Sequence, residues 1–325
     1  TADIAFLLLV FFLATTTMNV DSGMFRKLPP YQQDDTEVPK VAKRNILQVL
    51  VNRNNQLAVN GELMDVSKLK ERTIEFLLNP MNDENLPEKK VENIDLLGNV
   101  EVSKGIVSLQ SDKGTSYEMY IAVQDQLAAA YNEVRDRKAV TKWGKKYSAL
   151  TSDQQEALRK QVPMSISEAE PKNIGGKKET PAISTASLPD IVFMLLFFFM
   201  VSTTMREVTL MIQNNLPEAT QIAKLEKKSL VSNIYIGKPT MQFQKAYGTE
   251  PRIQLNDKFA TLQDLGAFVA AEREARKEEE RNSITNNLKV QSETTMGIVT
   301  DVKQELRKAN SLRINYGARQ KVTRN

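Results

Sequence analysis

Residues 3–18 read DIAFLLLVFFLATTTM, and residues 190–205 read DIVFMLLFFFMVSTTM. Aligned without a gap, ten of the sixteen positions are identical, including the aspartate at the start and Thr-Thr-Met at the end. A shared apolar composition would match scattered leucines and phenylalanines, but it would not reproduce both ends. The sequence therefore contains an internal repeat, a feature that has to be found before any fold is assigned.

The second copy has the length of a membrane span. Asp190 is the only charged residue in 183–205, and a helix of that length, at about 1.5 Å per residue, crosses a hydrocarbon core of about 30 Å. An ionised carboxylate inside this span is costly, so we expect it to be protonated or paired. Asp3 occupies the same position in the first copy. We predict Asp3 and Asp190 to be proton-carrying groups; the alternative is an acid at the headgroup boundary that acts as a helix N-terminal charge.

Hydroxyl side chains follow each aspartate at a distance of some 18 Å along the helix. They could line a proton path, although hydroxyls that bond back to carbonyls of their own helix are commoner in membrane spans. The residues concerned are Thr15, Thr16, Thr17, Ser202, Thr203 and Thr204.

Composition excludes several classes of function. With 41% hydrophobic and 26% charged residues, the 325-residue chain suits soluble domains on short anchors rather than a polytopic transporter. The net charge of +4, without a basic block interleaved with aromatics, gives no support for nucleic-acid binding. The absence of Cys and His removes thiol catalysis, disulfides, the common zinc sites and Ser-His-Asp triads. We expect no enzyme, no cofactor and no metal site.

The first half predicts a small α+β unit after its span. The pattern predicts strands at 46–51, 57–59, 105–110 and 164–167, with an Asn60-Gly61 turn. It predicts a helix capped by Asp65, a long helix that begins with the capping box 115–118, and a polar helical stretch at 143–160.

The second half repeats this plan. Strands are predicted at 234–236, 252–255, 288–291 and 312–316, with helices after the capping box 261–264 and at 297–308. The charged run 272–281 is interpreted as a solvated helix face with internal ion pairs. The sequence pattern of each half thus predicts a transmembrane helix, a linker and a domain of β-α-β-α-β order. The predicted segments are spans 1–18 and 183–205, linkers 19–43 and 206–230, domains 44–170 and 231–325, and a cytoplasmic segment or seam at 171–182.

Charge around the second span predicts its orientation. Lys172, Lys177 and Lys178 lie upstream, which places that flank in the cytoplasm and the following domain outside. If both copies have this orientation, the chain must return to the cytoplasm, yet no long apolar stretch lies between Met18 and Ile183. Either one copy runs backwards or two polypeptides are joined end to end. We favour the second, with a seam near 173–176, and we expect the sequence to begin inside a longer chain.

These residues resemble the ExbD/TolR family. The resemblance rests on Asp3 with Thr15-Thr-Thr-Met18, on Asp190 with Thr203-Thr-Met205, and on the loop Asp112-Lys-Gly-Thr-Ser-Tyr117 before a long helix. The second half, with residues 179–190 ahead of its apolar run, resembles a second ExbD-type paralogue. The resemblance covers nearly all of the chain. It is specific in the spans and is carried mainly by pattern in the globular parts.

The resemblance implies a role in the bacterial inner membrane, with a cytoplasmic N-terminus and a periplasmic domain. ExbD-like proteins sit in pairs inside a pentameric ExbB-like ring, respond to protons through the aspartate that matches Asp3 and Asp190, and pass work through TonB to outer-membrane transporters. Here the two halves would supply a heterodimer in contact with membrane lipid. The alternatives are a TolR- or MotB-like stator with another client, or a passive envelope anchor that binds peptidoglycan or a partner.

Overall fold

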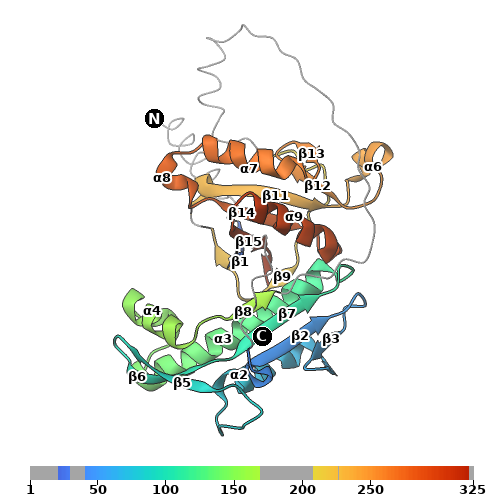
Figure 1. The fold of residues 1–325 in the computed structure, drawn as a ribbon. Helices are drawn as coiled ribbons and strands as arrows, with labels where there is room; N and C mark the ends of the chain where they lie inside the picture. The colour runs from blue at the N-terminus through green and yellow to red at the C-terminus, as the bar shows by residue number, and fades with distance from the viewer. Residues whose placement is uncertain (1–20, 30–40, 169–207, 226, 322–325) are drawn as a thin grey trace, which may run out of the picture.

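The computed structural model describes residues 21–29, 41–168, 208–225 and 227–321 (Figure 1). Within these residues, none of the helices combines the length and the hydropathy of a membrane span. The predicted spans 1–18 and 183–205 and the seam near 173–176 lie outside the described residues. The same holds for every predicted site residue, namely Asp3, Asp190, Thr15, Thr16, Thr17, Ser202, Thr203 and Thr204.

The first unit, drawn in blue and green in Figure 1, is built on a five-stranded sheet of order β4-β3-β2-β7-β8. β2, β7 and β8 run parallel, while β3 and β4 form antiparallel neighbours. Asn60 and Gly61 both have positive φ, as a two-residue hairpin turn of type I′ requires, and this turn joins β3 to β4. The strands are β2 (Ile46–Val51), β3 (Leu57–Val59), β4 (Glu62–Met64), β7 (Ile106–Ser111) and β8 (Ile166–Glu168).

Two helices pack beside each other on this sheet, α2 (Leu69–Leu78) and α3 (Tyr117–Trp143). The Asp65 carboxylate accepts a hydrogen bond from Ser67 N–H, and a short 3-10 turn (Val66–Lys68) leads from this cap into α2, which confirms the predicted cap. At α3 the cap is Ser116, which accepts from Met119 N–H at 3.3 Å.

The β-α-β-α-β prediction misses a hairpin between the two helices. β5 (Lys89–Ile94) and β6 (Gly98–Ser103) pair antiparallel and form a small second core with α4 (Ser152–Gln161). Mostly polar sequences, KKVENI and GNVEVS, hide this hairpin from pattern analysis, because only Ile94 and Val102 are buried. The polar stretch 143–160 is not one helix either, since α3 ends at Trp143, Gly144 follows in the left-handed region, and α4 begins only at Ser152.

The second unit repeats the sheet order of the first. Its central strands run β15-β14-β11-β12-β13, with β11, β14 and β15 parallel and β12 and β13 antiparallel. The strands are β11 (Val231–Gly237), β12 (Arg252–Leu255), β13 (Lys258–Ala260), β14 (Thr285–Val290) and β15 (Arg313–Gly317), and the helices are α6 (Met241–Tyr247), α7 (Asp264–Glu274), α8 (Glu278–Arg281) and α9 (Met296–Lys308).

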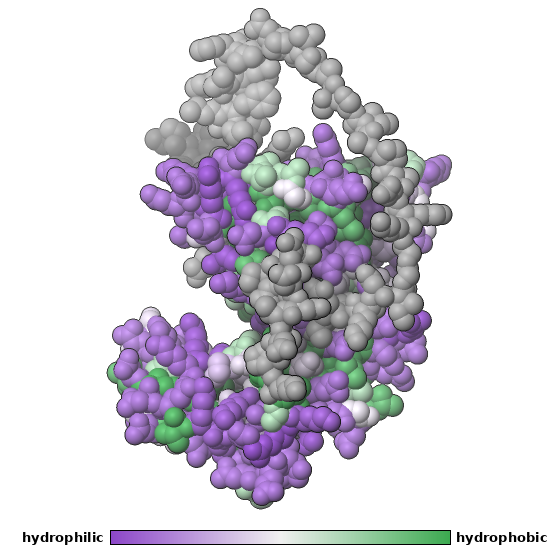
Figure 2. All heavy atoms as spheres, in the orientation of Figure 1, coloured by the Kyte–Doolittle hydropathy of each residue, from purple (hydrophilic) through white to green (hydrophobic). Residues whose placement is uncertain are grey.

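The charged run divides between α7 and α8. Arg276, between the two helices, forms an i,i+4 ion pair with Glu272 at 2.8 Å, as the interpretation of a face with internal ion pairs anticipates. Glu272 is nevertheless half-buried, and its carboxylate also accepts a hydrogen bond from Ser232, so this position is not a freely solvated face. On the face shown in Figure 2, hydrophilic residues predominate and hydrophobic ones form small separate patches.

The segment predicted as a linker over 19–43 differs most from expectation. Residues Ser22–Lys27 form β1, which pairs antiparallel with β15 and extends the sheet of the second unit (Figure 1). β10 (Ala223–Lys224) adds to β1 in turn, which gives a sheet of seven strands. β9 (Glu218–Ala219), in the predicted linker 206–230, pairs with β16 (Arg319–Gln320). The partners of these strands lie far away in sequence, so local patterns cannot reveal them. One hydrophobic core runs through both units.

Candidate functional site

The joint between the two units is the part of the described structure in which equivalent elements of the two repeats meet. The loop 112–116 leads into α3, and the loop 291–295 leads into α9. Ser116 and Thr295 form an antiparallel bridge between these loops. Both residues are the caps of their helices. Equivalent positions of the two units therefore face each other.

Backbone hydrogen bonds across the joint come in matched pairs. Tyr117 N–H donates to the Thr294 carbonyl at 2.7 Å, and Met296 N–H donates to the Thr115 carbonyl at 2.7 Å. One residue further on, the N–H groups of Glu118 and Gly297 donate to the carbonyls of Ser292 and Lys113. The first N–H groups of a helix have no partner within it, so each loop satisfies the helix of the other unit. The joint thus has an approximate twofold axis between Ser116 and Thr295.

This axis defines equivalent positions. Gln124 lies eight residues after Ser116, and Lys303 lies eight residues after Thr295, so the two are counterparts on α3 and α9. Glu168 pairs with Leu109 in the first sheet, and Tyr316 pairs with Leu288 in the second. Because β7 and β14 are counterparts, Glu168 and Tyr316 are counterparts as well.

A buried polar cluster occupies the axis. Glu168 and Lys303 form an ion pair in which the Lys303 side chain is 8% exposed. The Tyr120 hydroxyl donates to Glu168 Oε1 at 2.7 Å and lies 2.9 Å from the Tyr316 hydroxyl. Gln124 Nε2 donates to the same carboxylate oxygen at 3.0 Å. Glu168 therefore collects partners from both units.

The charges of the pair hold each other in the ionised state. Burial alone raises the pKa of Glu168, but the Lys303 charge and its hydrogen bond outweigh this effect and hold that pKa below its usual value. Burial likewise lowers the pKa of Lys303, but the Glu168 charge, helped by Tyr316, raises it above its ordinary value. The pair is thus a charged contact inside the joint.

Segments that follow the two apolar repeats cross between the units. β1, from the first half, lies on β15, and its Arg26 donates to Gln124 Oε1 at 3.0 Å. In the opposite direction, a turn of the second half lies on α3, where the buried Asp125 accepts from Thr220 N–H, from the Thr220 hydroxyl and from Gln221 N–H at 2.6–2.8 Å. The two halves therefore exchange arms at the joint.

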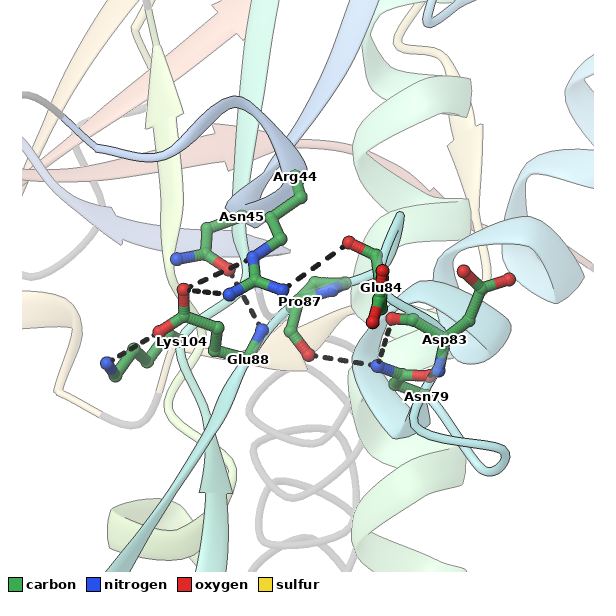
Figure 3. Close-up of polar contacts among 8 residues, drawn as sticks. All are labelled: Arg44, Asn45, Asn79, Asp83, Glu84, Pro87, Glu88 and Lys104. Atoms are coloured by element: carbon green, nitrogen blue, oxygen red, sulfur yellow. Dashed lines mark hydrogen bonds and ion pairs between the residues drawn. The ribbon is translucent and has the colours of Figure 1, made fainter.

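A second polar cluster lies at the opposite end of the first sheet (Figure 3). Glu88 forms ion pairs with Arg44 and Lys104. These contacts lower the pKa of Glu88, and the hydrogen bond from Lys104 has the largest effect. Asn45 Oδ1 accepts from Glu88 N–H at 2.9 Å, and Asn79 Nδ2 donates to the Pro87 carbonyl at 3.1 Å. These bonds fix the loop between α2 and β5, so we assign this cluster a structural role. No group of three or more metal-ligating side chains occurs in the part of the chain that the structure describes.

The predicted site residues and the joint do not overlap, because the former lie outside the described residues. Sequence reasoning missed the joint, although one signal was present. On α9 the apolar positions Val299, Val302 and Leu306 are interrupted by Lys303, which is a charged residue on a core-facing stripe. Such a residue is buried only when it has a partner.

Comparison with models of known protein families identifies the family of this chain. The family model for the biopolymer transport protein ExbD/TolR matches residues 1–135 and 176–320. No curated protein matches the chain significantly. The two matched segments contain the two apolar repeats and most of the two units, and together they cover most of the chain. This chain therefore belongs to the ExbD/TolR family of biopolymer transport proteins and contains two ExbD-like copies.

Proposed function

We propose that the two copies form the ExbD-type part of a stator in the bacterial inner membrane, driven by the proton motive force. Asp3 and Asp190 are its proton-responsive groups. In this proposal each apolar repeat spans the membrane once, inside a ring of ExbB-type subunits, and the two α+β units lie in the periplasm. There they act on a TonB-type protein that energises outer-membrane transport. The role is mechanical, without an enzymatic reaction.

The observation that carries the proposal is the short connection between both apolar repeats and one sheet. Three residues after Met18, Asp21 forms an ion pair with Lys289 of β14 at 2.7 Å. Four residues after Met205, Thr209 N–H donates to Asp257, beside β12, at 2.9 Å. A fully extended chain covers at most about 3.6 Å per residue, so either connection reaches no further than about 14 Å.

Both repeats are therefore tied to the sheet of the second unit by connections too short to absorb a large displacement. A shift of either repeat would pull on the same sheet, from its β1–β15 side or from its β12 side. This arrangement suits a device in which two membrane segments act on one periplasmic body. A passive anchor needs only one attachment of any length.

The energetics are adequate for such a device. A proton that crosses the membrane field carries about 2.3 kcal/mol per 100 mV. This free energy can bias a two-state arrangement by more than about tenfold. The neutral acid is tolerated against an apolar wall, whereas the ionised acid seeks a polar partner such as a hydroxyl on a neighbouring subunit. Alternation between these contacts converts proton entry and exit into rotation or rocking.

Proton uptake tests the proposal. The chain is reconstituted in liposomes with its ring partner, and uptake is compared among the wild type, Asp3→Asn, Asp190→Asn and the control Asp153→Asn, the same change at an exposed position of α4. We expect both aspartate variants to assemble and to lose proton-dependent uptake, and the control to keep it. Unchanged uptake in both aspartate variants would leave a passive anchor as the better account.

A further inference from the structure

We propose that the buried ion pair between Glu168 and Lys303 makes the two units pair with each other rather than each with a second copy of itself. The proposal concerns partner choice at the joint. It does not depend on the proton role of the aspartates.

The argument begins with the position of the pair. Residues close to a twofold axis meet their own counterparts whenever two identical units pair. Here the axis passes between Ser116 and Thr295, and the cluster is made of the counterparts Gln124 and Lys303 together with Glu168 and Tyr316. Two related units can form three pairings: first with second, first with first, and second with second. The side chains in the cluster differ among these three pairings.

Pairing of two second units would be the least favourable. It would bury two copies of Lys303 opposite two copies of Tyr316, without the carboxylate that Lys303 contacts in the observed joint. An ammonium group that loses its partner in a buried site is strongly destabilising. The hydroxyl of Tyr316 can accept a hydrogen bond, but it cannot balance the charge.

Pairing of two first units would be unfavourable for the opposite reason. Each Glu168 would face Gln124 in place of Lys303. Arg26 also favours the ionised form of Glu168, but its guanidinium donates to Gln124, and it lowers the Glu168 pKa less than Lys303 does. The carboxylate would keep the Tyr120 and Gln124 hydrogen bonds and lose its charge partner.

Other contacts at the joint are also unlike across the axis. Asp125 binds the backbone of Thr220 and Gln221, whereas its counterpart on α9 is Gln304. The backbone bonds between the two loops, in contrast, are matched and would form in any pairing. The backbone contacts of the loops therefore do not discriminate between partners, and the side chains on the axis determine which units pair.

The chain contains no Cys, so introduced cysteines report pairing without background. Thr295 lies at the axis, and a Thr295→Cys substitution in the full chain forms a disulfide between two chains only when two second units pair. Ser116→Cys together with Thr295→Cys reports the unlike pairing. Because Ser116 and Thr295 are helix N-caps, the cysteine substitutions change these caps. Within one cysteine background, however, every variant carries the same change.

The decisive variant separates partner choice from stability. Replacement of a buried ion pair by apolar residues is often neutral or stabilising. In the Thr295→Cys background, Glu168→Met with Lys303→Met should fold, as measured by circular dichroism, and its disulfide-linked dimer should rise about tenfold or more. The matched control Lys308→Met, a change of the same kind at an exposed position of α9, should leave the dimer at the wild-type level.

A charge exchange provides the complementary test. In the double-cysteine background, Glu168→Lys alone and Lys303→Glu alone should each lower the yield of the 116–295 disulfide by about tenfold or more, and the two together should restore most of it. The proposal is overturned if the like dimer stays at the control level in the folded double-Met variant. It is also overturned if the charge exchange is no better than the single changes.

Discussion

The two units share one strand order but differ at the sheet edge beyond their last parallel strand, which is β8 in the first unit and β15 in the second. In the second unit β15 is covered by β1, a strand from the first half. In the first unit the counterpart of β15 is β8, which pairs with β7, while additional structure, the β5–β6 hairpin and α4, gathers around a small second core. The connections from both apolar repeats lead to the sheet of the second unit, and the first unit contacts the second half through α3.

The largest expected effect comes from detaching β1. A Cβ at Gly23 would lie 2.1 Å from the Tyr316 carbonyl oxygen, a backbone atom that cannot move aside cheaply. Gly23→Ala should lower the free energy of unfolding by about 3 kcal/mol or more, because the strand must shift or leave. Denaturant unfolding measures the loss, and hydrogen exchange at β15 shows where it occurs. Protected β15 amides in this variant would mean that β1 does not hold the sheet edge.

The next effect concerns the arm that runs in the opposite direction. Asp125→Ala removes the acceptor of three hydrogen bonds and leaves two backbone N–H groups of the 220–221 turn without it. We expect a loss of roughly 2 kcal/mol, with faster exchange in residues 218–224 and little change at β1. As a control, the exposed Asp153→Ala on α4 should have no effect on that segment. Equal exchange at the turn in both variants would contradict the exchange of arms.

The ion pair at the axis predicts a pH dependence. The pKa of Glu168 is lowered by folding, so its contribution is present above about pH 4.5 and is lost as the pH falls through the folded value. The pKa of Lys303 is raised by folding, so its contribution is present below about pH 10.5 and is lost as the pH rises beyond the folded value. Stability should therefore be greatest between these limits. The double-Met variant should show a flatter profile, and identical profiles would contradict the role of the pair.

The smallest expected effect is stabilising. Gly266 lies in α7, and a Cβ there would meet no atom within 4 Å. Gly266→Ala should raise the free energy of unfolding by about 0.5–1 kcal/mol through helix propensity. It is the matched counterpart of Gly23→Ala, since the same change has opposite signs in an open helix and in a crowded strand. A destabilised Gly266→Ala variant would show that α7 is packed more tightly than described.

Local patterns predicted the strands, turns and caps whose own residues carry the signal. β2 and β3 form a hairpin with a short turn, and the Asn60-Gly61 turn and the Asp65 cap are set by neighbouring residues, so both could be read directly. β1 could not be predicted in this way, because its register depends on residues 313–317, almost the whole length of the chain away. The β5–β6 hairpin escaped because it is largely solvated.

For the joint, the sequence contained the residues but not their pairing. Lys303 on an apolar stripe indicates that a buried acid exists somewhere, and many acids are available. Only the fold identifies Glu168 as that acid, because it brings β8 against α9 at the joint where the two capping loops also meet. The roles of Asp3 and Asp190 remain predictions from sequence and family, since these residues lie outside the described part of the chain.

The central claim is that protonation at Asp3 and Asp190 is transmitted through the short connections to the sheet of the second unit. Hydrogen exchange of β1, β12 and β15 tests it most directly, with the chain and its ring partner in liposomes, before and after a proton gradient is imposed. We predict that the gradient changes exchange in these strands of the wild type and changes nothing in the variant carrying both Asp3→Asn and Asp190→Asn. The same gradient-induced change in both proteins would contradict the claim.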